Sequence, residues 1–290
     1  MNQAEINNLL LRANALVKTN WLHAVHILEQ AASDHPGHPQ ILQNLGDIFM
    51  QRQLYEKALA FYQDALKFNP ADSYLLFLIG NCYFALGDYR LANSYFNQIA
   101  DPQPEVLYNK ALALAFLGQH QESITVIRQI LTVLTDNPFI YFLLIEQYMR
   151  TSNYDEAIQS IRKAERKFGK HNQLLLFNAI IHARKGIWLT SYHSFQEYEK
   201  VLPLNNADHL STYALTAKKL GLIDNSIALL IRARTLDPYL SSIHEELIRL
   251  QLHKKDLEGA RKSMTIAQRY ISRSTPILRL LKERINSGDI

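Results

Sequence analysis

The residues of this chain that could do chemistry are few, and they do not combine into a known catalytic motif. Gly169-Lys170 is the only Gly-Lys pair, and no second glycine lies upstream at the spacing of a phosphate-binding loop. His244 precedes two glutamates, but the second histidine of a zinc protease motif is missing downstream. The sequence therefore predicts neither a nucleotide site nor a metalloprotease site.

Histidine and cysteine supply the other candidates. His23 and His26 would share one side of a helix, and His35 and His38 follow in a loop, without cysteine or carboxylate partners at metal-ligand spacing. Cys82 lies within an apolar segment and is expected to be a buried, small hydrophobic residue. We expect no metal, no cofactor and no catalytic activity from this chain.

The composition is that of an ordered protein. Of the 290 residues, 48% are apolar and 20% are charged, whereas disordered chains are depleted in apolar side chains. A single cysteine cannot form an intrachain disulfide, so a reducing compartment and a cytoplasmic location are expected. No secretory signal is visible at the N-terminus, and no apolar run reaches the about 18 residues of a membrane span.

Charge is distributed unevenly along the chain. Residues 1–145 carry 8 basic and 12 acidic side chains, net −4, and residues 146–290 carry 23 and 15, net +8. The sum is the formal net charge of +4. Such a difference can steer a complementary partner over about one Debye length, ~8 Å in physiological salt.

The elements that must position any site are indicated by a small residue that recurs along the chain. Two antiparallel helices can approach closely only where a side chain is small. The residues are Ala24, Ala58, Ala92, Ser123, Ala157, Ser191, Ser226 and Ala260, with spacings of 34, 34, 31, 34, 34, 35 and 34. A period of about 34 residues is typical of solenoids made from helix pairs.

Other positions repeat with the same period. Three residues before each small residue stands a group predicted to fill the turn between helices: Trp21, Tyr55, Tyr89, His120, Tyr154, Trp188, Ile223 and Leu257. Two residues earlier again the first helix must end, at Gly87, Gly118, Gly186 and Gly221, or at Thr19, Gln53, Ser152 and Lys255. Glycine there suits the left-handed backbone of a helix C-terminus.

These residues resemble the tetratricopeptide repeat. The best-matching unit contains Leu45, Gly46, Phe49, Tyr55, Ala58, Tyr62, Ala65 and Pro70. The resemblance implies an all-α, right-handed superhelical α-solenoid of eight helix-turn-helix repeats that forms a single domain over residues 1–290. The predicted repeats are 5–38, 39–72, 73–103, 104–137, 138–171, 172–206, 207–240 and 241–274, followed by a capping helix at 275–287. Arg12, Ile145 and Ile248 depart from the small residue that the family prefers beside its first helix.

The resemblance also implies a concave groove lined by the first helix of each repeat. Its aromatic residues in the third to sixth repeats are Tyr74, Phe77, Phe84, Tyr108, Phe116, Phe139, Phe142 and Phe177. Its polar residues are Asn44, Asp47, Asn81, Asn109 and Glu146, which could hydrogen-bond an extended peptide. The alternatives are that the rings pack between helices as core and that the polar side chains are simply solvated.

Some family members hold a C-terminal carboxylate with two asparagines and three cations. Asn81 and Asn109 occupy the asparagine positions, but Phe77, Phe139 and Leu143 replace the cations. A hydrophobic or mixed peptide is therefore expected as the ligand rather than a carboxylate of that kind.

Cations recur near the ends of the first helices in the C-terminal half: Arg150, Arg184, Lys185, Lys218, Lys219, Lys254 and Lys255. This basic row could dock an acidic partner, or it could simply complement the helix dipoles, which favour cations at helix C-termini. No nucleic acid is expected, because the cations are interspersed with acids and match no known binding motif.

The sequence thus predicts a non-catalytic scaffold or adaptor that binds a protein or an extended peptide in an aromatic-lined groove. A secretion or assembly chaperone that shields a hydrophobic client segment, and a regulatory subunit of a complex, are the alternatives. Self-association into a homo-oligomer is left open.

Overall fold

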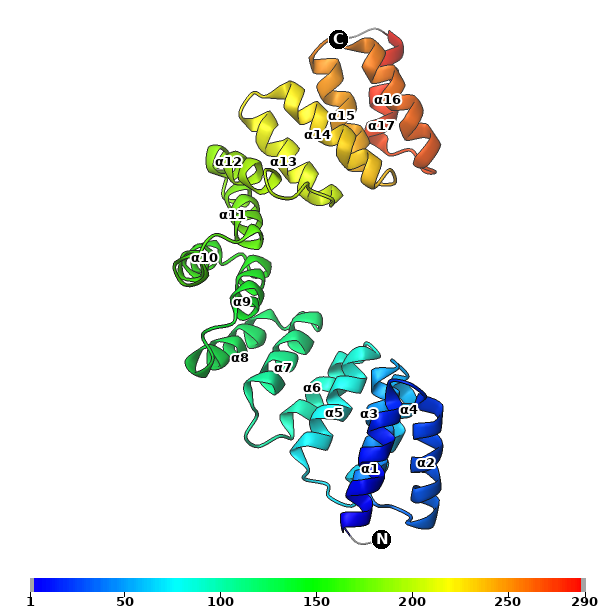
Figure 1. Ribbon diagram of the computed structural model, residues 1–290. Helices are drawn as coiled ribbons and strands as arrows, with labels where there is room; N and C mark the ends of the chain where they lie inside the picture. Colours follow the sequence, from blue (N-terminus) through cyan, green and yellow to red (C-terminus); the bar gives the residue numbers. More distant parts are fainter. Residues whose placement is uncertain (1–2, 288–290) are drawn as a thin grey trace. The chain divides into compact units, whose positions relative to one another are not determined.

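The computed structural model describes residues 3–287, and each regular element within that range is an α-helix (Figure 1). The first helices of successive pairs are α1 (Gln3–Val17), α3 (Pro39–Gln51), α5 (Ser73–Ala85), α7 (Pro104–Phe116), α9 (Pro138–Arg150), α11 (Asn172–Arg184), α13 (Ala207–Lys219) and α15 (Ser241–His253). The second helices are α2 (Trp21–Asp34), α4 (Tyr55–Leu66), α6 (Tyr89–Asn97), α8 (His120–Val133), α10 (Tyr154–Phe168), α12 (Trp188–Glu199), α14 (Ile223–Leu236) and α16 (Leu257–Tyr270). Helix α17 (Pro276–Ser287) follows the last pair.

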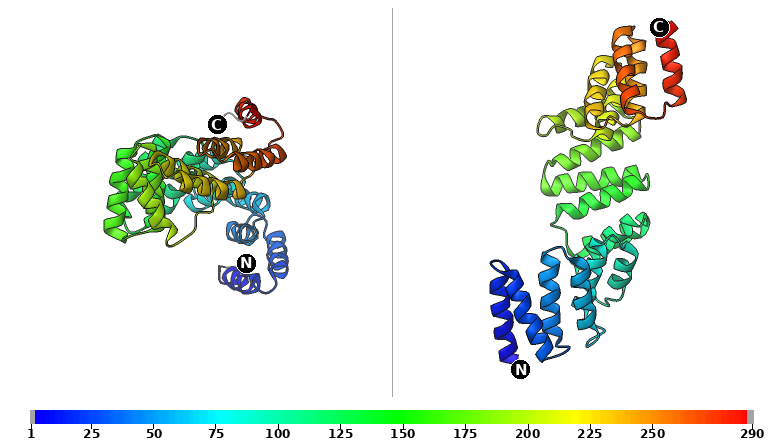
Figure 2. Two further views of the ribbon diagram at one scale, coloured as in Figure 1. Left: turned by 90° about the horizontal axis from the view of Figure 1, so that it is seen from above. Right: turned by 90° about the vertical axis from the view of Figure 1, so that its right-hand side faces the viewer.

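The helices form two compact units, unit 1 (Met1–Thr151) and unit 2 (Ser152–Ile290). Within each unit every helix packs on the next one along the chain, as Figure 2 shows. First helices also contact each other, as in α5 with α7 and α11 with α13. Packing between neighbours in the sequence confirms the predicted all-α solenoid. The division between the units falls inside the predicted repeat 138–171, and the eight repeat boundaries stay a prediction.

The small residues that recur along the sequence lie where helices pack most closely. All eight have an exposed fraction of 0–1%. Where the residue is serine, its hydroxyl donates a 2.8 Å hydrogen bond to the carbonyl oxygen of an alanine twelve residues earlier, in the paired first helix. The three serines are Ser123, Ser191 and Ser226. A serine can replace alanine here because its buried hydroxyl has a hydrogen-bond partner.

The turn between paired helices follows the predicted pattern. Each of the eight bulky turn residues, from Trp21 to Leu257, is the first residue of a second helix, and each is half-buried. The preceding helix ends with a left-handed residue in seven of the eight turns, at Gln53, Gly87, Gly118, Ser152, Gly186, Gly221 and Lys255. The positive φ angle turns the backbone sharply enough for the second helix to fold back on the first.

The first turn is different, and it changes which residue of α1 lies at the close approach to α2. Thr19 does not adopt the left-handed conformation, and the N–H of Asn20 bonds four residues back to Leu16, whereas the equivalent bond of the second turn spans five residues. This tighter turn shifts α1 by one residue. Ala13 is consequently fully buried, and Arg12, which was predicted to occupy the close approach, is exposed.

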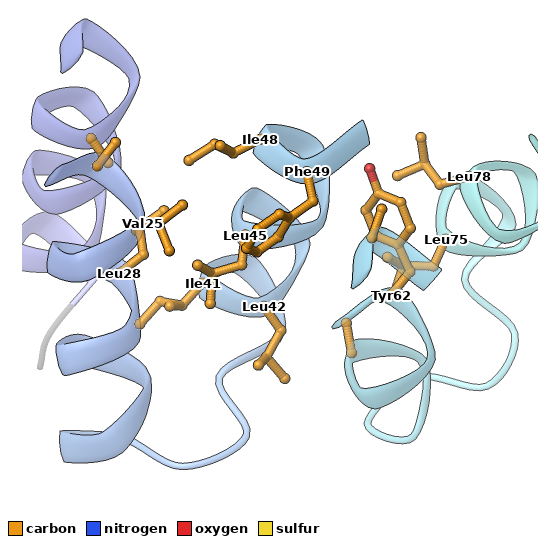
Figure 3. Packing of buried hydrophobic residues seen from close by; sticks show 14 of the residues in the cluster. Val25, Leu28, Ile41, Leu42, Leu45, Ile48, Phe49, Tyr62, Leu75 and Leu78 are labelled. Atoms are coloured by element: carbon orange, nitrogen blue, oxygen red, sulfur yellow. The ribbon is translucent and has the colours of Figure 1, made fainter. Parts of the chain in front are cut away.

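Aliphatic and aromatic side chains from successive helices fill the core of unit 1 (Figure 3). Gly46 and Gly80 let a ring lie directly on the first helix, because a β-carbon at either position would overlap the ring of Tyr62 or Phe96. In the last pair Ile248 stands at the equivalent position, and the facing residue is the more flexible Met264. A larger side chain on the first helix is therefore matched here by a smaller or more flexible one on the second helix.

Helix α17 closes unit 2. Its Leu278, Leu281 and Ile285 are buried against a cluster that includes Leu252 and Met264 of the last pair. Its opposite side is exposed to solvent. Within residues 3–287, none of the helices has the length and apolar character needed to span a bilayer.

Candidate functional site

The most distinctive surface of unit 1 is a set of aromatic rings on its first helices. We call it the aromatic face, and it consists of Tyr74 and Phe84 on α5, Tyr108 and Phe116 on α7, and Phe139 and Phe142 on α9. Counted from the first residue of each helix, these residues stand at positions 2, 5, 12 and 13, which share one side of an α-helix. Exposed fractions of 54% for Tyr74, 60% for Phe116 and 61% for Phe139 leave much of these rings in water.

Three rings gather where α5 and α7 end. Phe116 stacks on Tyr89 with ring centroids 4.6 Å apart, and Phe84 meets both rings edge-on at 5.7 and 5.2 Å. Sequence reasoning placed Phe84 and Phe116 in the groove but treated Tyr89 only as a turn residue. Its position at the start of α6, directly after the turn, was the signal that could have linked it to both rings.

A second ring pair lies on α9. Phe139 and Phe142 meet edge-on with centroids 5.8 Å apart, and Phe142 is half-buried. The half-buried ring holds the exposed one in place, which limits the side-chain entropy lost when a partner covers it.

Two aromatic residues assigned to the groove by sequence do not belong there. Phe77 and Phe177 have exposed fractions of only 9% and 8%. The ring of Phe77 lies 6.2 Å from that of Phe96 and joins the core formed by α5, α6 and α7. For these two residues the prediction of a groove position was wrong, because a ring at the middle of a first helix can turn toward the next pair and become core.

The polar residues predicted to bind a peptide backbone mostly bond to one another or to their own helices. Asn109 donates a 2.8 Å hydrogen bond to the side-chain oxygen of Asn81, which ties α7 to α5. Asn44 donates to the carbonyl of Gln40 on its own helix, at 2.9 Å. Asn109 and Asn44 therefore already use an amide N–H, and Asn81 its amide oxygen, in bonds inside the protein.

Asp47 is engaged as well. It accepts a 2.7 Å hydrogen bond from the hydroxyl of Tyr62, and burial raises its pKa above the usual range. Burial, together with the charges of Asp47 and Glu105, also raises the pKa of Tyr74. Tyr74 therefore stays protonated at neutral pH and offers a hydroxyl donor on the aromatic face.

The basic row proves to be largely a set of contacts between neighbouring pairs of helices. Lys185 pairs with Asp155, Lys218 with Glu246 and Lys254 with Asp224, while Arg150 lies 3.6 Å from Glu146 on its own helix. Lys219 lies over the ring of Trp188 at 5.8 Å. Each of these five cations thus has a partner inside the protein, and docking of an acidic partner along the basic row stays a prediction. Arg184 is exposed.

A cation also joins neighbouring helix pairs in unit 1, at a residue that the sequence did not single out. The guanidinium of Arg52 lies 5.3 Å from the ring centre of Trp21 and donates a 2.9 Å hydrogen bond to the carbonyl of Val17. A cation at the end of one first helix thus reaches the start of the preceding second helix. Because many of these pairs are exposed, each contributes only about 0–1 kcal/mol.

The candidate nucleophile Cys82 lies in the core of unit 1. Cys82 is buried and donates a weak hydrogen bond to the sulfur of Met50 at 3.9 Å. Burial, and to a lesser extent the charge of Asp47, raises its pKa to about 12, so the thiol is a poor nucleophile at neutral pH. Among residues 3–287, no three His, Cys, Asp or Glu side chains are grouped as a metal site would require.

Comparison with protein families agrees with this geometry. A model described as "TPR repeat" matches residues 46–87, and two described as "Tetratricopeptide repeat" match residues 74–101 and 104–133. The chain is a tetratricopeptide-repeat protein. Comparison with curated proteins finds no match.

Solved structures share the fold of this tetratricopeptide-repeat protein at low sequence identity. The C-terminal part of a TPR protein from Cytophaga hutchinsonii has a TM-score of 0.65 at 16% identity, with 81% of this chain and 97% of that chain covered. PilW, described as a widely conserved type IV pilus biogenesis factor, gives 0.60 at 19% identity and coverage of 72% and 98%. A chain of the APC/C hetero-tetramer Cut9–Hcn1 gives 0.59 at 18% identity, and this chain spans 57% of its length.

Tetratricopeptide-repeat proteins bind other proteins or peptides. In this one the positions of the carboxylate-binding cations hold Phe77 and Leu143, which are buried, and Phe139, which is exposed. The two asparagines of that motif are bonded to each other. The three cations that would bind a carboxylate are thus missing at these positions, and aromatic rings are prominent on the exposed first helices of unit 1.

Proposed function

We propose that this protein is a non-catalytic scaffold or adaptor that binds a hydrophobic or mixed segment of a partner protein on the aromatic face of unit 1. The observation that carries the proposal is the exposure of Tyr74, Phe116 and Phe139 on first helices, at 54–61% each. Exposed apolar patches on soluble proteins commonly mark interaction sites.

The rings can supply substantial binding energy. An aromatic side chain offers about 150–250 Å² of surface, so covering the exposed part of one ring removes about 100 Å² from water. At about 25 cal/mol per Å², each ring contributes about 2.5 kcal/mol before the entropic cost of association. Three rings can therefore supply a large part of the gross binding energy of a complex, in keeping with the prominence of aromatic residues in binding hot spots.

Selection of peptides from a random library on the immobilised protein tests the proposal. Selected peptides should contain aliphatic or aromatic anchors, and the triple variant Tyr74→Ala/Phe116→Ala/Phe139→Ala should bind them at least tenfold more weakly. The matched control is Leu22→Ala/Leu91→Ala/Val133→Ala, which removes three exposed apolar side chains from second helices of the same unit. The aromatic face would be refuted as the binding site if both variants lost peptide affinity equally, or if neither variant lost any.

The same rings would also serve a secretion or assembly chaperone that shields a hydrophobic client. The fold similarity to PilW, a pilus biogenesis factor, is compatible with such a role. An adaptor should leave the solubility of its partner unchanged, whereas a chaperone should keep an otherwise aggregating client in solution. Light scattering of the client with and without the protein separates the two. A regulatory subunit of a larger complex is a third role that the same surface could support.

The proposal also covers the cellular location of the protein and its oligomeric state. The buried thiol of Cys82 is suited to a reducing compartment, and we propose a cytoplasmic location on that basis. Homo-oligomerisation through the aromatic face would compete with a partner for the same rings. The mass of the protein in solution, measured by light scattering before and after addition of a selected peptide, would reveal that competition.

A further inference from the structure

A hollow in unit 2 is lined mainly by basic side chains. It lies where α15 and α17 end, has a volume of about 260 Å³, and is bounded by Arg249, Leu252, His253, Lys255 and Arg284. Leu252 is the only apolar residue among these five. The hollow is separate from the aromatic face, which belongs to unit 1.

Two of these cations, Lys255 of the basic row and Arg284, differ in their contacts from most of the basic row. Lys185, Lys218 and Lys254 each pair with a carboxylate of a neighbouring helix pair. By contrast, Lys255 and Arg284 form no ion pair or side-chain hydrogen bond with any residue that the structure describes. Like charges that converge on one hollow repel each other, so an anion bound between them would be favoured.

The carboxylate of Glu246 does not neutralise the hollow. Arg249 lies 3.7 Å from Glu246, which is a long ion-pair distance. The same carboxylate is already paired with Lys218. One negative charge is thus shared by two cations, which leaves Lys255 and Arg284 as an excess of positive charge at the hollow.

Helix dipoles account for only part of this charge. A helix C-terminus carries about half a negative elementary charge, so the ends of α15 and α17 together offset about one cation. Arg249, Lys255 and Arg284 supply three. Lys255 also lies beyond the end of α15, with a φ angle of 63° that glycine would adopt more easily.

We propose that this hollow binds the carboxylates of an acidic peptide segment. Arginine guanidinium groups such as those of Arg249 and Arg284 can hold a carboxylate through two parallel hydrogen bonds. No aromatic ring lines the hollow, so a nucleic acid base would find no stacking surface. The site goes beyond the aromatic face and uses different residues, because it recognises charge rather than apolar surface.

Binding of fluorescein-labelled hexaglutamate to the full-length protein, followed by fluorescence anisotropy at low salt, tests the inference. We expect binding that weakens as salt is added, and little binding of labelled hexaglutamine. Lys255→Gly and Arg284→Gln should each weaken hexaglutamate binding about two- to fivefold, which is typical of one exposed charge pair. Lys255→Gly relieves the left-handed backbone, so its thermal stability should not fall and misfolding cannot explain its weaker binding.

The matched control is Arg261→Gln, which removes one exposed cation from α16 at a position outside the hollow. It should keep the affinity for hexaglutamate near that of the wild type. The inference is wrong if hexaglutamate does not bind, if both hollow variants bind like the wild type, or if Arg261→Gln weakens binding equally. Tighter binding of oligothymidylate through Lys255 and Arg284 would replace the acidic peptide with a nucleic acid.

The aromatic face gives an independent control. The variant Tyr74→Ala/Phe116→Ala/Phe139→Ala should bind hexaglutamate like the wild type, because none of these residues lines the hollow. Failure of the hollow and failure of the aromatic face would thus be seen in different measurements.

Discussion

At the scale of single residues, two glycines let large rings lie against the first helices. Gly80→Ala should destabilise the protein by about 1–3 kcal/mol, because the added methyl group would overlap the ring of Phe96. At an ordinary helix position the same change stabilises by up to about 1 kcal/mol, so the sign of the effect is diagnostic. Urea unfolding followed by circular dichroism measures the difference.

A second substitution tests whether overlap is the cause. Phe96→Leu alone should leave a cavity and destabilise, but combined with Gly80→Ala it should recover part of the lost stability. Unit 2 already uses this smaller combination, with Ala214 and Leu230 at the equivalent positions, both buried. Strictly additive effects of the two substitutions would contradict the packing explanation.

A buried histidine makes stability depend on pH. His244 is fully buried, its Nε2–H donates to the carbonyl of Pro238 at 2.8 Å, and its Nδ1 has no hydrogen-bond partner among the described residues. Burial, with a smaller effect from the charge of Arg234, lowers its pKa from 6.5. The unfolded chain therefore binds the proton more readily, and stability present above about pH 6.5 is lost as pH falls through the lowered pKa.

Unfolding free energies at about pH 7.5 and about pH 5.5 measure this effect. His244→Leu should reduce the loss of stability between the two pH values. The same substitution at the exposed His26 should leave the loss unchanged. An identical pH dependence in the wild type and in His244→Leu would show that folding does not lower the pKa of His244.

At the scale of elements, α17 seals the last helix pair through one apolar side. Leu281 has an exposed fraction of 3%, whereas its neighbour Leu280 is 58% exposed. Leu281→Ala should cost about 2–4 kcal/mol through lost burial and the cavity left behind. Leu280→Ala, the same change on the exposed side, should cost less than about 0.5 kcal/mol.

Hydrogen exchange shows where the Leu281→Ala variant opens. Faster exchange should appear in α17 itself and in α15 and α16, the two helices that it contacts. Exchange in α3 and α4 should not change, because solenoid stability is transmitted mainly between neighbours. Uniformly faster exchange along the whole chain would mean that the fold unfolds as one cooperative body.

The sequence was sufficient to predict the helix pairs, since one small residue and one turn residue recur in each pair and every one of them has a structural role. It was not sufficient for the first turn, where the absence of a left-handed residue at Thr19 moves Ala13 into the core. Nor could it assign Phe77, whose side chain faces either solvent or core according to the packing of α6 and α7. The ion pairs of the basic row could not be predicted, because Asp155 and Asp224 lie 30 residues from Lys185 and Lys254. These pairs depend on how the helix pairs stack.

At the scale of the whole molecule, the chain combines two kinds of surface. Unit 1 presents aromatic rings on its first helices. Unit 2 presents a cationic hollow where α15 and α17 end. The two halves of the chain also differ in net charge, which is −4 for residues 1–145 and +8 for residues 146–290. A partner with an apolar segment and an acidic segment would find complementary chemistry in both units.

The central claim is that a partner protein contacts the aromatic face, and photo-crosslinking from that face tests it most directly. The photoreactive residue p-benzoylphenylalanine would replace Tyr74 or Phe139 in one set of proteins, and the exposed Leu22 or Val133 on second helices in the control set. We expect a discrete crosslinked partner from Tyr74 and Phe139, displaced by a selected peptide, and none from the control positions. Crosslinks of equal yield from Leu22 and Val133, or crosslinks from them alone, would contradict the account.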